Sequence, residues 1–444
     1  MHLHPLKTGK SYPLLYVDAF FKGVSYGGNV LGETMATLTA PRLAVHAVRT
    51  QPLPWYLWCG ALAVTSASVG AYWDVSWHRS IGRDTFWTPA HMAIYLCGVL
   101  AAVCCGYLIL TTTILRPRQM VASSVNVLGF RAPLGAFVAA WGGIAMLTSA
   151  PFDNWWHNAY GLDVKIISPP HTLLIIGSWA VSVGTLFLIV AEMNRAGKES
   201  ALTAAEQSER FQRLQGLVLY LAGIMLVSSM FFRTEYTSAT HLHGSVPYIS
   251  IALGTPLYLA AVRVVSRNRW ASTWMAVLYT VFVIGFILIL PLFPAEPKLG
   301  PVFQHVTHFV PPSFPLLIIV PAIAMDLLLG RTANLDRFQS TGRVTTWKPL
   351  LASLIAGPLF VLSLVAVQWP FASFLMTKAS QNRFFATGYY SYDTPPWSSG
   401  VLHQFVFTQH GLDLWKGLSM AMVYAAISTY LGLLLGRWMQ KIQR

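Results

Sequence analysis

The sequence has 444 residues, of which 55% are hydrophobic and 10% are charged, whereas about 25% are charged in an ordinary soluble domain. This composition argues against a soluble enzyme and favours a membrane protein. The net charge of +14 would suggest nucleic-acid binding in a soluble chain, but here the basic residues gather between apolar segments.

Residues 1–52 precede the first long apolar segment, and we predict that they form a cytoplasmic or interfacial N-terminal region. They lack the basic head, apolar stretch and small-residue cleavage site of a secretory signal peptide. Within them, residues 14–24 suit either a short amphipathic helix on the membrane surface or an unstructured tail.

Ten apolar segments follow, each close to the length of about 20 residues at which a helix crosses the hydrocarbon core of a bilayer. They cover residues 53–73, 89–113, 132–152, 170–192, 214–232, 246–264, 270–293, 309–330, 348–369 and 416–436. The predicted fold is therefore all-α: a polytopic membrane protein with about ten transmembrane helices.

Lys and Arg are distributed unevenly between these segments. We number each loop by the apolar segment that it follows. The N-terminal region, the four even-numbered loops and the C-terminal tail hold 22 of the 30 Lys and Arg residues, and the five odd-numbered loops hold the other 8. By the positive-inside rule, both termini are cytoplasmic and the odd-numbered loops face the opposite side. We expect a multi-pass protein of the inner (cytoplasmic) or an intracytoplasmic membrane, with the lipid bilayer and not nucleic acid as its partner.

The first two odd-numbered loops repeat one another. Residues 73–91 read WDVSWHRSIGRDTFWTPAH and residues 152–171 read FDNWWHNAYGLDVKIISPPH. Five residues recur 79 positions later and two recur 80 positions later: Asp74, Trp77, His78, Gly82, Asp84, Pro89 and His91 match Asp153, Trp156, His157, Gly161, Asp163, Pro169 and His171. The pattern indicates a duplicated unit. We predict a region of two similar hairpins over 53–200 and an additional transmembrane region over 201–444.

Each copy predicts one carboxylate and two imidazoles at the end of a helical hairpin. Asp74 and His78 are four residues apart, which places them on one face of a helix. Thr88 and Pro89 are typical of a helix N-cap and first helical residue. His91 then lies in the first turn, where the helix dipole disfavours a charged ring. The second copy follows the same plan with Asp153, His157, Ser168, Pro169 and His171.

Two histidines and one carboxylate with open positions suit non-haem iron, copper or zinc, and the affinity of imidazole favours copper. The spacing alone does not choose among these metals. A structural alternative is that Asp74 and Asp153 form local hydrogen bonds or ion pairs while the histidines cap helices. The recurrence of the pattern in two copies weighs against this alternative.

The first copy resembles the copper-site motif in the C subunit of the copper-dependent membrane monooxygenases, the particulate methane and ammonia monooxygenase family. That motif reads Asp-x3-His-x12-His in a WD-x-x-WH...RDT...TP-x-H setting. The matching residues are Asp74, Trp77, His78, Arg83, Asp84, Thr85, Thr88, Pro89 and His91. The second site of that subunit, Asn-x3-His-x13-His, has the spacing of the second copy, with Asp153 in place of Asn. The resemblance covers 73–171 and extends to about residue 200.

The resemblance implies that Asp74, His78 and His91 hold a principal copper ion and are the catalytic residues. It implies a second metal at Asp153, His157 and His171. Arg83, Asp84 and Asp163 would orient these ligands. Copper is expected ahead of iron or zinc. The chain would be the metal-bearing integral subunit of a complex with A-like and B-like subunits and an electron donor, and it would use O2 to hydroxylate ammonia, methane or a short hydrocarbon, with its metal sites toward the periplasmic side.

Two other functions stay open. One is a non-catalytic membrane subunit that binds metal for storage, delivery or assembly of a respiratory or oxidase complex, although sites with carboxylates and without cysteine do not favour a Cu(I) carrier. The other is a haem-b cytochrome, which fits less well because the histidines lie at helix ends.

The later odd-numbered loops carry weaker signals. Glu235, His241 and His243 precede the sixth segment, and His305 and His308 precede the eighth. They suit either a third site or a set of hydrogen-bonded interfacial histidines. The loop over about 370–415 is rich in aromatic residues, and we predict that it folds over the outer face as a lid or docking surface.

Overall fold

The structure is a computed structural model that describes residues 52–82, 85–161, 168–196, 202–234, 236–336 and 347–443. The predicted N-terminal region, with its amphipathic stretch, lies outside these residues. Eight helices in the described part of the chain are long and apolar enough to cross a membrane. The predicted all-α, polytopic membrane fold is thereby confirmed, and the described strands form only one short antiparallel hairpin.

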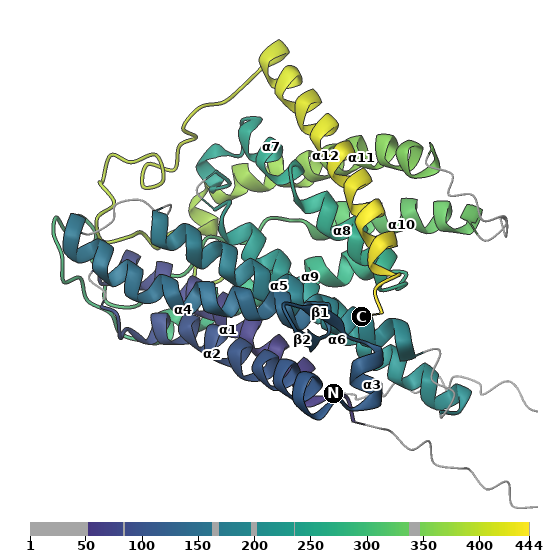
Figure 1. Ribbon diagram of the computed structural model, residues 1–444. Coiled ribbons are helices and arrows are strands. Elements are labelled where there is room, and N and C mark those ends of the chain that lie inside the picture. Colours follow the sequence, from purple (N-terminus) through teal and green to yellow (C-terminus); the bar gives the residue numbers. More distant parts are fainter. Residues whose placement is uncertain are drawn as a thin grey trace, which may run out of the picture. The chain divides into compact units, whose positions relative to one another are not determined.

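The helices follow one another along the chain with few other elements between them (Figure 1). Their bounds are α1 Trp55–Ser80, α2 Pro89–Leu110, α3 Arg118–Ala122, α4 Leu134–Tyr160, α5 Pro169–Ala196, α6 Ala204–Phe231, α7 Val246–Ala252, α8 Thr255–Val265, α9 Ala271–Ile289, α10 Ile319–Asp336, α11 Trp347–Leu375 and α12 Gly411–Met439. A π-helical turn, Thr111–Leu115, continues α2. The strands are β1 Val125–Val127 and β2 Phe130–Ala132.

Nine of the ten predicted segments coincide with a helix or with a pair of helices. The segment 309–330 is helical only from Ile319, because Pro311, Pro312 and Pro315 lack a backbone N–H and residues 309–318 belong to the loop before α10. The two segments that are not among the eight membrane-spanning candidates are α1, which is rich in small and polar residues, and α10, of which Ile319–Gly330 forms a shorter apolar helix. One predicted segment, 246–264, is interrupted, because α7 ends at Ala252 and α8 begins at Thr255.

The interruption between α7 and α8 combines a local feature with a contact from another element. Pro256 lacks a backbone N–H, and the guanidinium of Arg233 donates to the Ser250 carbonyl at 3.0 Å. In an unbroken helix that carbonyl would accept from the N–H of Gly254, which instead donates to Ile251. Arg233 therefore satisfies a backbone group that the break leaves without a helical partner.

The two predicted hairpins pack together as pairs, α1 with α2 and α4 with α5, and α2 also lies against α4 (Figure 1). The backbones of α4 and α5 nearly touch at two glycines. A Cβ atom added to Gly142 would lie 2.6 Å from the carbonyl oxygen of Gly177. Small residues at such crossings let membrane helices approach closely.

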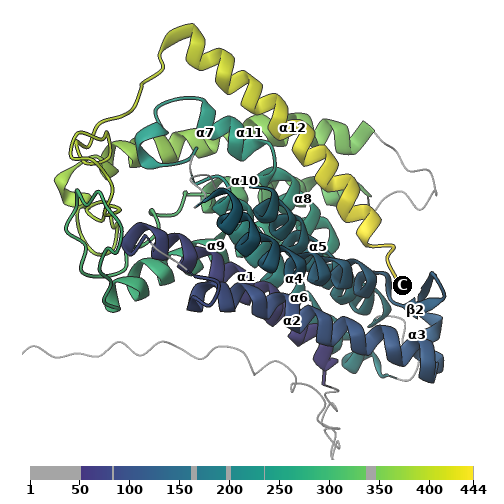
Figure 2. The same ribbon diagram turned by 60° about the vertical axis from the view of Figure 1, so that its left-hand side comes forward.

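Buried side chains form two main hydrophobic clusters. One is built mainly by α1, α2, α4, α5 and the first half of α6, and the other by the second half of α6 together with α7–α12. Figure 2 shows α12 running past α8 and α11. The end of α12 returns to the first cluster, because the Asn194 amide of α5 donates to the carbonyls of Met439 and Ile442.

Candidate metal centre

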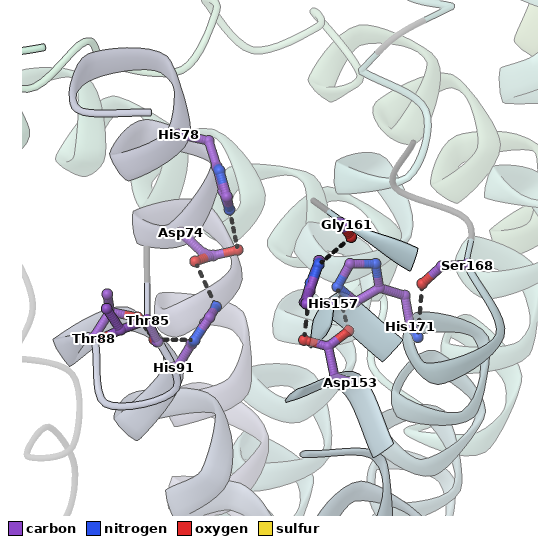
Figure 3. A network of polar contacts seen from close by, with 10 residues as sticks. All are labelled: Asp74, His78, Thr85, Thr88, His91, Asp153, His157, Gly161, Ser168 and His171. Carbon is purple, nitrogen blue, oxygen red and sulfur yellow. Dashed lines mark hydrogen bonds and ion pairs between the residues drawn. The ribbon is translucent and has the colours of Figure 1, made fainter. Parts of the chain in front are cut away.

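The first triad consists of Asp74, His78 and His91. The helix α1 continues past the predicted apolar segment to Ser80, so Asp74 and His78 lie one turn apart on it. His91 follows Pro89 in the first turn of α2. One carboxylate oxygen, Oδ1, lies 3.2 Å from His91 Nε2, and the other, Oδ2, lies 3.8 Å from His78 Nε2 (Figure 3).

The second triad consists of Asp153, His157 and His171, and its arrangement is the same. Asp153 and His157 lie one turn apart near the end of α4, and His171 lies in the first turn of α5. The carboxylate Oδ2 is 3.4 Å from His157 Nε2, and Oδ1 is 3.5 Å from His171 Nε2 (Figure 3). The structure thus brings all six predicted side chains together in two groups of three.

The repeated glycines also have the same role in both copies. Gly82 follows α1 with a φ of +85°, and Gly161 follows α4 with a φ of +88°. Residues with a Cβ rarely adopt this left-handed region, which is why helices commonly end at glycine. The glycines therefore end both helices directly after the triad residues.

The helices that carry His91 and His171 begin at the predicted prolines, Pro89 and Pro169. Their N-caps differ in detail. The hydroxyl of Ser168 accepts from the backbone N–H of His171 at 3.4 Å. The hydroxyl of Thr88 instead donates to the Thr85 carbonyl at 3.1 Å, so the predicted N-cap residue of α2 is in place without a side-chain cap bond.

One histidine of each triad is fixed by a backbone carbonyl. His91 Nδ1 lies 2.9 Å from the Thr85 oxygen, and His157 Nδ1 lies 3.2 Å from the Gly161 oxygen. A carbonyl oxygen only accepts, so Nδ1 carries the proton. In the neutral ring the Nε2 lone pair then faces a carboxylate oxygen. The Nε2 lone pair and the carboxylate oxygen are both acceptors, so their contact is favourable only with a second proton on the ring or with a cation between them. Apart from the recurrence of Gly161, no pattern in the sequence predicts these carbonyl contacts.

The two carboxylates share a further feature. In the described part of the chain, Oδ1 of Asp74 and Oδ1 of Asp153 are buried and have no hydrogen-bond partner, and neither has Nδ1 of His171. A buried polar atom without a hydrogen bond costs about 1–3 kcal/mol. In both copies this oxygen faces an imidazole Nε2, at 3.2 Å in His91 and at 3.5 Å in His171, so either a cation or a proton on that nitrogen would supply the missing interaction.

The distances between the groups also suit metal ligands. Two ligands that each lie about 2.0–2.2 Å from one ion are about 3.0–3.6 Å apart. Three of the four contacts, at 3.2, 3.4 and 3.5 Å, lie in this range, and the contact of His78 is longer, at 3.8 Å. However, no three His, Cys, Asp or Glu side chains among the described residues surround a position for a metal ion. The imidazoles touch the carboxylate directly, so metal binding requires them to turn away from it.

Other predicted residues are accounted for as follows. Arg83, Asp84, Asp163 and Glu235 lie outside the described residues. His241 Nδ1 contacts the Ser238 hydroxyl at 2.7 Å, and His308 Nδ1 contacts that of Thr307 at 2.9 Å. His243 is stacked between Trp369 and Phe405. Within the described ranges these contacts assemble no third metal site.

No protein-family model, curated protein or solved structure compared with the chain matches it. The resemblance to the copper-dependent membrane monooxygenases therefore rests on the residues of the two copies alone.

Proposed function

We propose that both triads bind copper and that the chain is the metal-bearing integral subunit of a copper monooxygenase-like membrane complex. The proposed reaction is O2-dependent hydroxylation of a small substrate such as ammonia, methane or a short hydrocarbon. One observation carries the proposal: in both copies a carboxylate contacts two imidazole Nε2 atoms while its Oδ1 is buried without a hydrogen-bond partner.

The residues of the first triad have distinct tasks in this proposal. Asp74 supplies negative charge, and His78 and His91 supply nitrogen ligands. The Thr85 carbonyl holds the proton of His91 on Nδ1, which keeps Nε2 available and the ring oriented. Bound copper would supply the one-electron chemistry that activates O2. The side chain of His91 is 15% exposed and that of His78 is 47% exposed, so the triad opens on the side of His78.

The setting of the triads suits an apolar substrate that arrives through the bilayer. Tyr95 lies beside His91, with 6.0 Å between the ring centroids. In the second copy, Trp156 packs on Tyr160 at 4.5 Å and on Phe152 at 6.2 Å. A multi-pass protein presents such rings at the level of the membrane interface. The A-like and B-like subunits, the electron donor, the inner membrane and the periplasmic orientation of the sites belong to the same proposal.

Metal analysis of the protein in lipid nanodiscs tests the ligand assignment. We expect one to two copper equivalents in the native sequence, with loss of most of the principal one in His91→Ala. The matched control is His241→Ala, which removes an outer-loop histidine outside both triads. Electron paramagnetic resonance of the oxidised protein follows the same samples. Full copper occupancy in His91→Ala would contradict the assignment.

Turnover separates an enzyme from a metal carrier. We expect oxygen consumption by the intact complex on addition of ammonia or a short hydrocarbon, and its loss in His91→Ala. Copper that is retained without turnover in any intact complex would instead favour the non-catalytic alternative, a subunit for metal storage, delivery or assembly.

A further inference from the structure

The end of α1 is held by residues that lie far away in the sequence. The hydroxyl of Ser76 donates to the Val310 carbonyl at 2.7 Å, and the Val310 N–H donates to the Ser80 hydroxyl at 2.7 Å. Both serines are buried. The guanidinium of Arg79 donates to the Pro311 carbonyl at 2.8 Å. An extended segment of the loop between α9 and α10 is thus bound along the last two turns of α1.

Backbone contacts extend this attachment. The N–H of Lys298 donates to the Ile81 carbonyl at 2.8 Å, and the N–H of Tyr392 donates to the Arg79 carbonyl at 3.1 Å. The ring of Tyr392 also occupies the space beside Gly82. We call these contacts, made by residues 76–82 with Lys298, Val310, Pro311 and Tyr392, the α1 dock. Figure 2 shows the loop between α11 and α12 near the end of α1.

The second copy has no equivalent among the described residues. The spacing of 79 residues pairs Ser76, Arg79, Ser80 and Ile81 with Trp155, Asn158, Ala159 and Tyr160. All four of these residues are exposed. A Cβ atom added to Gly161 would meet nothing within 4 Å, whereas one added to Gly82 would meet Tyr392. The two copies therefore share the triad but not the attachment behind it.

The α1 dock lies on the opposite side of the helix from the first triad. Ser76 and Ser80 are each two residues from a triad member, which is about 200° around a helix. Contacts on that face fix the rotation and position of the turns that carry Asp74 and His78, without blocking the triad. Groups that orient metal ligands commonly change metal affinity by about 10–100-fold when they are removed.

We infer that Lys298, Val310, Pro311 and Tyr392 position the first triad, and that Ser76, Arg79 and Ser80 are positioning residues for it. The described residues give the second triad no such attachment. This inference rests on the proposed metal-binding function. It gives the distal half of the chain a role at the first triad, and it makes the two sites unequal, with the first more rigid and tighter.

Hydrogen–deuterium exchange of the metal-free, full-length protein in nanodiscs tests the α1 dock directly. We expect slower exchange over residues 75–82 than over residues 154–161. Ser76→Ala/Ser80→Ala should speed exchange at the end of α1 and leave the end of α4 unchanged, which also reports that the protein is folded. Trp155→Ala, at the position that matches Ser76, is the control and should leave α1 unchanged. Equal exchange at the two ends in the native sequence would overturn the inference.

Copper titration then tests the positioning role. In an Asp153→Ala background, which leaves the first triad, Ser76→Ala/Ser80→Ala should weaken copper binding by about 10-fold or more and change its electron paramagnetic resonance spectrum. In an Asp74→Ala background, which leaves the second triad, the same pair should change neither. If the pair does not fold, each single alanine variant replaces it. Equal loss in both backgrounds, or loss in neither, would overturn the inference. Absence of copper from both backgrounds would overturn the proposed function and with it the positioning role, whatever the exchange experiment shows.

Discussion

Asp74 and Asp153 occupy the same position in the two copies, and the second is where the chain departs from the Asn of the family motif. The two side chains differ in whether they can donate a hydrogen bond. An amide can donate a hydrogen bond to the Nε2 lone pair of a neutral imidazole, whereas a carboxylate only accepts. Because the Gly161 carbonyl holds the proton of His157 on Nδ1, the carboxylate of Asp153 faces a lone pair. Asp153 therefore needs a cation or a second proton more than Asn would.

Asp153→Asn tests this reasoning. The amide group should donate to Nε2 of His157 or His171 and remove the negative charge, so copper binding at the second triad should weaken by about 10-fold or more. Titration in the Asp74→Ala background measures this triad by itself. The control is Asn154→Asp, which adds a carboxylate one residue away, on a different side of α4. Unchanged affinity in Asp153→Asn would show that the charge of Asp153 does not contribute to binding.

His243 gives a prediction about pH. It lies outside the membrane-spanning segments, stacked between the rings of Trp369 and Phe405 at centroid distances of 4.4 and 3.7 Å. Burial, together with the nearby charge of His410, lowers the pKa of His243 below its usual 6.5. The unfolded chain then binds a proton more readily, so the stabilising contribution is present above pH 6.5 and is lost as pH falls below it. We expect the thermal midpoint to drop between pH 7.5 and 5.5, less so in His243→Phe. His305→Phe should keep the native pH dependence.

At the scale of helices, the sequence pattern predicted which segments are apolar helices and where most of them begin. It did not predict the starts of α6 and α10, or how helices are interrupted or cross. The starts of α2 and α5 could be predicted because a proline at the first helical position is a local signal. The break between α7 and α8 depends on Arg233 reaching the Ser250 carbonyl. This contact joins separate elements, so no local pattern predicts it.

The crossing of α4 and α5 yields a stability prediction. In Gly142→Ala, the added methyl group would lie 2.6 Å from both the Gly177 oxygen and the Val181 nitrogen. Because these are backbone atoms, the helices must move apart, and the free energy of unfolding should fall by about 1–3 kcal/mol. Thermal unfolding in detergent measures the change. Gly285→Ala on α9 is the control, since a Cβ there meets nothing within 4 Å, and it should be neutral or slightly stabilising. Equal effects of the two substitutions would contradict the close crossing.

At the scale of the whole chain, the repeat predicted that the two triads are alike, and the structure adds how they differ. The six ligand candidates recur at fixed spacings, so the sequence alone could place them together. The α1 dock could not be predicted in this way, because Ser76 and Val310 are 234 residues apart and serine is common at helix crossings. In the second copy, Trp155 and Ala159 stand at the positions of Ser76 and Ser80. The sequence shows this difference, but its meaning is clear only once the contacts of the two serines are known.

The sidedness of the chain decides which compartment the triads face, and the positive-inside rule predicts it. Arg116 and Arg118 precede the β1–β2 hairpin and Arg131 lies in β2, so this hairpin should be cytoplasmic, whereas the loop between α11 and α12 should face outward. The four native cysteines lie within helices, and Cys97, Cys104 and Cys105 are buried, which keeps background labelling low. Leu128→Cys, at the 91% exposed tip of the hairpin, and Thr408→Cys, in the outer loop, are therefore matched probes for a membrane-impermeant maleimide. Thr408→Cys should react in intact cells, and Leu128→Cys only after the membrane that holds the protein is opened. The reverse result would put both triads on the cytoplasmic side, where an electron donor and O2 would have to reach them from within the cell.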